Sequence, residues 1–190
     1  MLNLILPKTR PHLQNPYLLS LPLYFLAGPI LGGGDWHRRM TELLLRNLEH
    51  RSDPRDCIIV NPSRYEPTHP HYQYRMKGPD EFPTQTLWER YYLREAALNW
   101  PSGCLIIFLA CESKTEPRKD GLPYAMDTRG EVGEWRAHLM HNPKTRLIIG
   151  AEPEFPGLRT IRRNFENAVG DHFKILGSME EVAERAMDFV

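Results

Sequence analysis

The sequence predicts an α/β fold, with one mostly parallel sheet of five strands and helices on both of its faces. Short apolar runs alternate about five times with segments in which apolar residues recur at helical spacing. Alternation of this kind is typical of parallel sheets that are covered on both faces. The 190 residues contain no internal repeat and no linker-like stretch, and 41% of them are hydrophobic. We therefore expect one domain, residues 1–190, with a substantial core.

The N-terminal region divides at its prolines. Residues 1–20 hold three prolines and show no clear period, so we expect an extended N-terminal arm. The run over residues 21–27 (LPLYFLA) is long enough for a buried strand, and we expect it to be the first strand of the sheet. The α/β domain then occupies residues 21–190.

A glycine-rich loop and a long polar loop follow the first two expected strands. Residues 28–34 break the first strand, and Asp35 is a suitable N-cap for a helix that reaches residue 48. Residues 57–60 (CIIV) predict the second strand. The loop over residues 62–83 is rich in proline, tyrosine, histidine and charge, and loops of this length are typical of lids or binding loops.

The second half of the chain repeats the alternation. Thr84 is a suitable N-cap for a helix that ends near residue 99, and residues 104–110 (CLIIFLA) are the most strand-like run, expected at the centre of the sheet. A polar loop leads to a helix that carries Trp135 and Leu139 on one face. The remaining expected elements are a strand over 147–150, a helix over 159–169, a weak fifth strand over 172–176 and a last helix capped by Ser178.

Three loops should meet at one edge of this sheet. Right-handed crossovers place the loops that follow the first three strands along the carboxyl edge. Residues 28–34, 61–83 and 111–131 would then share one crevice, which is where open α/β sheets bind ligands. The start of the helix after residue 126 leaves two interpretations open. Thr128 and Glu131 have the spacing of a capping box, and an acidic residue at this edge also suits chemistry.

Composition excludes several classes of protein. Lys+Arg and Asp+Glu both number 24, which argues against a nucleic-acid binder with a broad basic face. The apolar runs are far shorter than a membrane span, and the N-terminal residues do not resemble a signal peptide. The three cysteines form no CxxC pair, so we expect small buried hydrophobes, a reducing compartment and a cytoplasmic location.

Neither a cofactor nor a metal ion is expected. The glycines of residues 28–34 match neither GxGxxG nor the Walker spacing, although a strand, a glycine loop and a helix can together hold a phosphate or a sugar. A flexible turn explains these glycines equally well. His69 and His71 lack a third metal ligand at a recognisable spacing. The tyrosines of the long loop would either stack on a base or pack the loop down: Tyr65, Tyr72 and Tyr74.

Four stretches occur in an order that matches one known family. They are residues 25–30 (FLAGPI), Asn61-Pro62, Trp88-Glu89 on a helix, and residues 128–135 (TRGEVGEW). From about residue 22 to about residue 150 the chain resembles the nucleoside 2-deoxyribosyltransferase-like proteins. The resemblance implies a doubly wound, flavodoxin-like fold, and it implies cleavage of the N-glycosidic bond of a nucleoside or nucleotide. It also suggests a homodimer or a larger homo-oligomer, and no nucleic-acid or membrane partner is expected.

The resemblance assigns Glu131 as the nucleophile. In this family a Glu of the T-x-x-E-x-G stretch attacks the sugar C1′ and holds it as an ester, until another base or water accepts the sugar. A carboxylate also stabilises an oxocarbenium-like transition state, as in retaining glycosidases. An unperturbed Glu has a pKa of about 4.3, so we expect Glu131 to be ionised at neutral pH. A position in the first helical turn would stabilise that charge by about 0.3–1 kcal/mol.

The other expected site residues surround Glu131. Asp127 would orient sugar hydroxyls or carry a proton to the departing base, and Glu134 is the alternative carboxylate on the same helix face. The expected substrate-binding residues are Phe25, Gly28, Pro29, Asn61, Trp88, Thr128 and Glu134.

The chain departs from the family pattern at two positions. Family members often carry a Tyr at the end of the first strand, where this chain has Phe25, and the neighbouring Tyr24 would point to the opposite face. They also tend to carry an Asp just before the third strand, where Ser102 and Gly103 stand.

Three alternatives to base exchange therefore stay open. One is a hydrolase of nucleoside 5′-monophosphates, for which Arg38 and Arg39 would bind the phosphate unless they are solvated helix charges. Another is a phosphoribohydrolase of the cytokinin-activating type, which is disfavoured because the paired glycines before Thr128 are absent. The last is a nucleotide-binding or partner-binding module of the same fold without catalysis.

Overall fold

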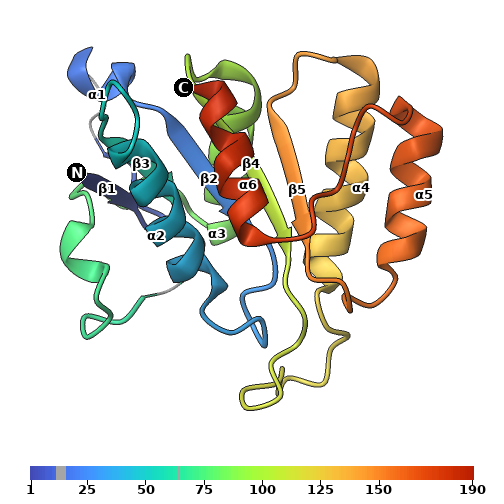
Figure 1. Ribbon diagram of the computed structural model, residues 1–190. Coiled ribbons are helices and arrows are strands. Elements are labelled where there is room, and N and C mark those ends of the chain that lie inside the picture. The colour runs from blue at the N-terminus through green and yellow to red at the C-terminus, as the bar shows by residue number, and fades with distance from the viewer. Residues whose placement is uncertain (12–15, 64) are drawn as a thin grey trace.

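The computed structural model describes residues 1–11, 16–63 and 65–190, and these form an α/β fold around one five-stranded sheet (Figure 1). The strand order is β1-β3-β2-β4-β5, and every pairing of neighbouring strands is parallel. The doubly wound, flavodoxin-like fold predicted from the sequence is confirmed. The strands are β1 (Leu2–Ile5), β2 (Leu23–Ala27), β3 (Cys57–Val60), β4 (Gly103–Leu109) and β5 (Leu147–Ala151).

Helices cover both faces of the sheet. On one face α2 (Trp36–Glu49) and α6 (Met179–Ala186) pack together, in front of the strands in Figure 1. The opposite face is covered by the helices α3 (Gln85–Arg94), its π-helical continuation η2 (Glu95–Asn99), α4 (Met126–His141) and α5 (Leu158–Val169). Three short helices complete the fold: α1 (Pro16–Ser20), η1 (Tyr72–Tyr74) and η3 (Met187–Phe189).

The strands are apolar on both sides because each face of the sheet has its own core. In β2, Leu23 and Phe25 belong to the cluster under α3 and α4, whereas Tyr24 and Leu26 belong to the cluster under α2 and α6. This is the alternation of side chains that a strand imposes. The expectation that Tyr24 points away from Phe25 is therefore confirmed.

The N-terminal arm needs a correction. Leu2–Ile5 is not an arm outside the sheet but the edge strand β1, paired in parallel with β3. Leu2, Leu4 and Ile5 are at most 5% exposed, so this short apolar run gains its stability from burial on both faces of the sheet. The neighbouring prolines hid that run from a search for periodicity.

The expected fifth strand needs a correction too. Residues 172–176 form no strand, and only Leu176 makes an isolated bridge, to Gly150 within β5. Within this segment only Ile175 is buried, so the burial of apolar surface contributes little to stabilising a strand here. The sheet still has five strands, because β1 supplies one at the other edge.

The strand order creates a switch point between β2 and β4. From β2 the chain moves to β3 on one side, and from β3 it returns across the sheet to β4 on the other side. The loops that leave β2 and β4 therefore diverge at the carboxyl edge, where open α/β sheets bind their ligands.

Other local expectations can be checked directly. Thr84 and Ser178 cap α3 and α6, since their side chains accept hydrogen bonds from the N–H groups of Leu87 and Glu181. Asp35 precedes α2 without making a side-chain cap bond. Within the described residues, no helix combines the length and the apolar character that crossing a bilayer requires.

Candidate functional site

A cleft of about 1150 Å³ opens at the carboxyl edge of the sheet. Its walls come from the loops after β2, β3 and β4 and from the first turns of α3 and α4, so the predicted convergence of three loops is confirmed. The volume is at the upper end of the range for small-molecule sites. Residues central to the argument below line it: Phe25, Gly28, Pro29, Tyr65, Gln85, Glu89, Arg118, Asp127, Thr128 and Glu131.

The glycine loop is packed closely against its neighbours. Gly28 has a φ of +151°, and a β-carbon added there would lie 2.4 Å from the carbonyl oxygen of Phe108 and 2.6 Å from the ring of Trp36. The indole N–H of Trp36 donates to the carbonyl of Pro29 at 2.9 Å. The carbonyl of Gly32 accepts from the N–H of Ser113 at 2.7 Å, which joins this loop to the one after β4. The glycines thus allow tight packing of the cleft wall.

We expect Gly28→Ala to destabilise the fold by roughly 2–4 kcal/mol, because the added methyl group meets backbone and an indole ring and the left-handed φ strains any other residue. Urea unfolding followed by circular dichroism measures the change. Gly130→Ala is the matched control, since that position is exposed, lies inside α4 and has no atom within 4 Å of an added β-carbon. The control should keep or raise the stability, and equal losses in both variants would contradict the packing argument.

Helix α4 begins earlier than the sequence pattern indicated. Its first residue is Met126, and its N-cap is Ala125, which has a φ of +55° and makes no side-chain cap bond. Thr128 and Glu131 therefore lie within the helix, and the capping-box interpretation is wrong. Glu131 belongs to the second turn, where the helix dipole contributes little, whereas Asp127 occupies the first turn.

Glu131 lines the cleft without a partner from the protein. Among the described residues, none donates a hydrogen bond to its carboxyl group or forms an ion pair with it. Burial, followed by repulsion from Glu89 and Asp127, raises the pKa of Glu131 to about 8. The expectation of an ionised Glu131 at neutral pH is therefore wrong. At pH 7 the Glu131 carboxyl group is protonated in most molecules, and a cationic group in the cleft would favour its ionisation.

The structure brings most of the predicted site residues together. Phe25 and Gly28 close the cleft from the end of β2, and Pro29 follows in the same wall. Asp127 and the buried Thr128 reach it from the start of α4.

Three predicted residues lie outside the cleft lining. Trp88 is fully buried, packs against Phe25 and donates its indole N–H to the carbonyl of Thr9. Asn61 is also buried, and its side-chain oxygen accepts from the N–H of Ser63 in the turn after β3. Glu134 is exposed and forms an ion pair with Arg90 at 3.2 Å. These placements indicate structural roles for the three side chains.

Sequence reasoning missed several charged residues that line the cleft, among them Glu89 and Arg118. Glu89 is one residue beyond Trp88, and Gln85 donates its side-chain amide to the Glu89 carboxylate at 2.8 Å. The i,i+4 spacing of Gln85 and Glu89, three positions before the i,i+4 aromatic pair Trp88 and Tyr92, was the available signal. Arg118 comes from the loop after β4, and its guanidinium is engaged by Asp120. No local pattern marked it.

The long loop after β3 reaches the cleft through Tyr65 and His69. Their rings stack with centroids 3.5 Å apart, and the Nε2 atom of His69 lies 3.6 Å from a carboxylate oxygen of Asp35. Across the described residues, no group of three His, Cys, Asp or Glu side chains is arranged to hold a metal ion. Arg38 pairs with Asp35, so the idea that Arg38 binds a phosphate in this cleft gains no support.

The sequence was compared with protein-family models and with curated proteins, and neither comparison found a match. The case for a function therefore depends on the chemistry of the cleft.

Proposed function

We propose that this protein cleaves the N-glycosidic bond of a nucleoside or nucleotide through a covalent glycosyl ester on Glu131. The observation that carries the proposal is the carboxyl group of Glu131, which lines the switch-point cleft and has no partner among the described residues. A carboxyl group that makes no hydrogen bond with the described residues is available to a substrate. The resemblance of residues 128–135 to the T-x-x-E-x-G stretch supports the same role.

The reaction would proceed in two displacements. An oxygen of the ionised Glu131 attacks C1′, the C1′–N bond breaks, and its electron pair leaves with the base nitrogen. The departing base nitrogen takes up a proton from a water molecule, which Asp127, the nearest acidic residue along α4 that lines the cleft, would orient. Water or the nitrogen of a second base then attacks C1′, and the C1′–O bond breaks to regenerate the carboxylate.

The acidic surroundings of Glu131 suit this chemistry. Glu89 and Asp127 raise the pKa of Glu131 because they place negative charge nearby, and the same charges stabilise a cationic, oxocarbenium-like transition state. As positive charge develops on the sugar, it also favours the ionised form of Glu131.

We expect kcat/KM for base release to rise with pH and to reach a plateau above about 8, because the nucleophile must lose its proton and its pKa is about 8. Initial rates from pH 5.5 to 9.5 measure the profile. A rate that instead falls above pH 8 would mean that Glu131 acts as a proton donor, which contradicts the covalent mechanism.

The decisive assay uses a panel of nucleosides and 5′-nucleotides, each with and without a second free base. Exchange of the base would identify a transferase, and release of the base alone would identify a hydrolase. Intact-protein mass spectrometry after rapid quenching should show a species heavier by one sugar residue. If no substrate in the panel is turned over, the proposed activity is wrong.

A binding module without catalysis is the second candidate, and Phe25 favours it. Phe25 lines the cleft but has no hydroxyl group, and the hydroxyl of Tyr24 is buried in the core on the other face of the sheet. No tyrosine of β2 can therefore donate a hydrogen bond to Glu131. Ligands that raise the melting temperature without being turned over would identify this function.

A further inference from the structure

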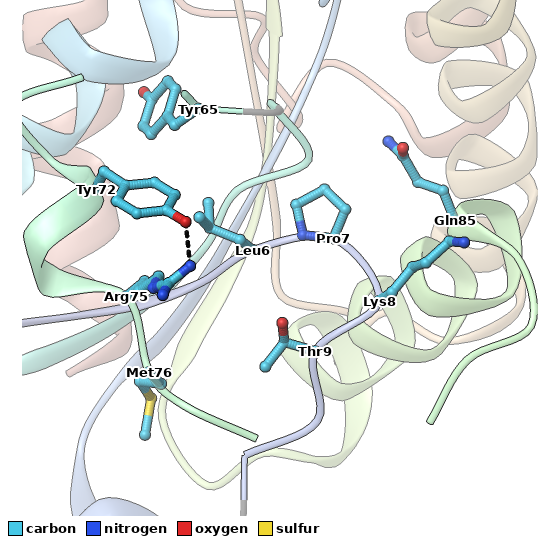
Figure 2. A pocket seen from close by; sticks show the side chains of 9 residues that line it. All are labelled: Leu6, Pro7, Lys8, Thr9, Tyr65, Tyr72, Arg75, Met76 and Gln85. Carbon is cyan, nitrogen blue, oxygen red and sulfur yellow. Dashed lines mark hydrogen bonds between the residues drawn. The ribbon is translucent and has the colours of Figure 1, made fainter. Parts of the chain in front are cut away.

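A second cavity of about 360 Å³ adjoins the cleft, and nothing above assigns it a role. It forms where the chain leaves β1 and passes the loop after β3 (Figure 2). Tyr65, Tyr72 and Arg75 lie on one side of the passing segment and Gln85 on the other, with Lys8 extending toward Gln85. The lining residues are Leu6, Pro7, Lys8, Thr9, Tyr65, Tyr72, Arg75, Met76 and Gln85.

The second cavity and the cleft differ in charge. Lys8 and Arg75 line the second cavity, and among the described residues that line it there is no Asp or Glu. Neither cation has an ion-pair partner within the part of the chain that the structure describes. The cleft, in contrast, is lined by one arginine, Arg118, and by six acidic residues: Asp35, Glu66, Glu89, Glu116, Asp127 and Glu131. An anionic group would therefore be repelled by the cleft and attracted to the second cavity.

Lys8 occupies a backbone position that lysine rarely adopts. The N–H of Thr9 donates to the carbonyl of Leu6 at 3.2 Å, with Pro7 and Lys8 at the centre of the turn. The φ of Lys8 is +67°, and a turn with proline second and a positive φ third favours glycine or asparagine at that third position. Lys8 therefore combines a strained backbone with a cationic side chain that has no ion-pair partner among the described residues, and this combination beside a cavity indicates a ligand site.

Arg75 is held in place for the same cavity. Its backbone forms a bridge with Leu4 of β1, and the N–H of Met76 donates to the carbonyl of Leu4 at 2.7 Å. The guanidinium lies 4.4 Å from the centre of the Tyr72 ring and donates to the Tyr72 hydroxyl. A guanidinium fixed in this way still presents further N–H donors to an oxyanion.

The two cavities share part of their walls. Tyr65 and Gln85 line both of them. Gln85 also donates its side-chain amide to Glu89, which lines the cleft, at 2.8 Å. The two cavities are therefore neighbours, which is the arrangement that one elongated ligand in contact with both of them requires.

We propose that the cavity beside Lys8 and Arg75 binds the phosphate of a nucleotide whose glycosidic bond lies in the acidic cleft. The inference rests on the proposed function and narrows its substrate class from nucleosides in general to phosphorylated ones. Aliphatic and aromatic neighbours reduce the competition of water for the phosphate, which strengthens its attraction to the cations that line the cavity.

Titration calorimetry on Glu131→Gln, which should not turn substrate over, tests the proposal with a nucleoside and its 5′-mono- and diphosphates. We expect a phosphorylated ligand to bind at least about tenfold tighter than the nucleoside at low salt. In this background, Lys8→Gly and Arg75→Gln should each weaken nucleotide binding about five- to tenfold and leave nucleoside binding unchanged. Lys77→Gln, at an exposed position outside both cavities, is the matched control and should change neither affinity.

Lys8→Gly separates binding from folding. Glycine suits the φ of +67° at this position, so the melting temperature should stay the same or rise while nucleotide binding weakens. Equal affinities for nucleoside and nucleotides, or nucleotide binding that ignores both substitutions, would overturn the proposal. Inorganic phosphate alone provides the last arm: if its binding depends on Lys8 but nucleotides bind no tighter than nucleosides, the idea of one spanning ligand is overturned. A failed base-release assay would leave these affinities unaffected, so the two proposals can fail separately.

Discussion

Glu131→Gln should reduce base release or base exchange by at least about 10³-fold, because an amide cannot form the glycosyl ester and carries no charge to stabilise the oxocarbenium-like transition state. Glu131 has no protein partner among the described residues, so its replacement breaks no contact of the fold. The loss should therefore appear in kcat, with substrate binding and circular dichroism largely retained. Steady-state kinetics on the best substrate of the panel measure it.

The matched control for this prediction lies on the same helix. Glu134→Gln makes the same chemical change at an exposed position outside the cleft lining, where only a surface ion pair with Arg90 is lost. Its activity should stay within about threefold of the original protein. If both Glu131→Gln and Glu131→Ala kept their activity, the role of Glu131 as the nucleophile would be refuted.

The same Glu131→Gln substitution should stabilise the protein, by an amount that grows with pH. The pKa of Glu131 is about 8 in the folded protein, against a reference value of 4.5 for the unfolded chain. Between these values the folded state binds more protons than the unfolded state, so the stability of the original protein falls as the pH rises from about 4.5 to about 8. Glutamine does not titrate. The difference in unfolding free energy should thus be small at pH 4.5 and largest above pH 8.

The expected size of this effect is roughly 2–3 kcal/mol, because the side chain is only partly buried and solvent screens part of the full shift. Urea unfolding of both proteins at several pH values between 5 and 9 measures it. If the unfolding free energies of the two proteins change in parallel with pH across this range, Glu131 ionises near its ordinary pKa. That result would also remove the physical basis for the predicted pH profile of activity.

The elements of the fold that short local patterns determine could be predicted from the sequence. The apolar runs of β2, β3, β4 and β5 were long enough, or isolated enough, to be recognised. Strand β1 was missed because its four residues lie beside Pro7 and Pro11, and only pairing with β3 stabilises it. Its burial is a property of the whole sheet, which no local window contains.

The candidate site was predictable in its position but not in its chemical state. Parallel strands and right-handed crossovers were sufficient to bring the loops together. The start of α4 depends on Ala125 in a left-handed conformation, which residue preferences do not indicate for alanine. The raised pKa of Glu131 comes first from burial and then from repulsion by Glu89, which belongs to another helix. Trp88 and Glu89 are adjacent on α3, and the sequence alone could not decide which of the two lines the cleft.

The hydrogen bond from the Trp88 indole to Thr9 connects the sheet's edge strand to the chemistry of the cleft. Trp88 and Glu89 are neighbours on α3, so a bond that fixes the orientation of one also sets the angle at which the other is presented. A small rotation of α3 about its own axis would break this bond and change the position of the Glu89 carboxylate in the cleft. Changes in the segment that follows β1 would therefore alter the electrostatics of the cleft at a distance, without altering any residue that lines it.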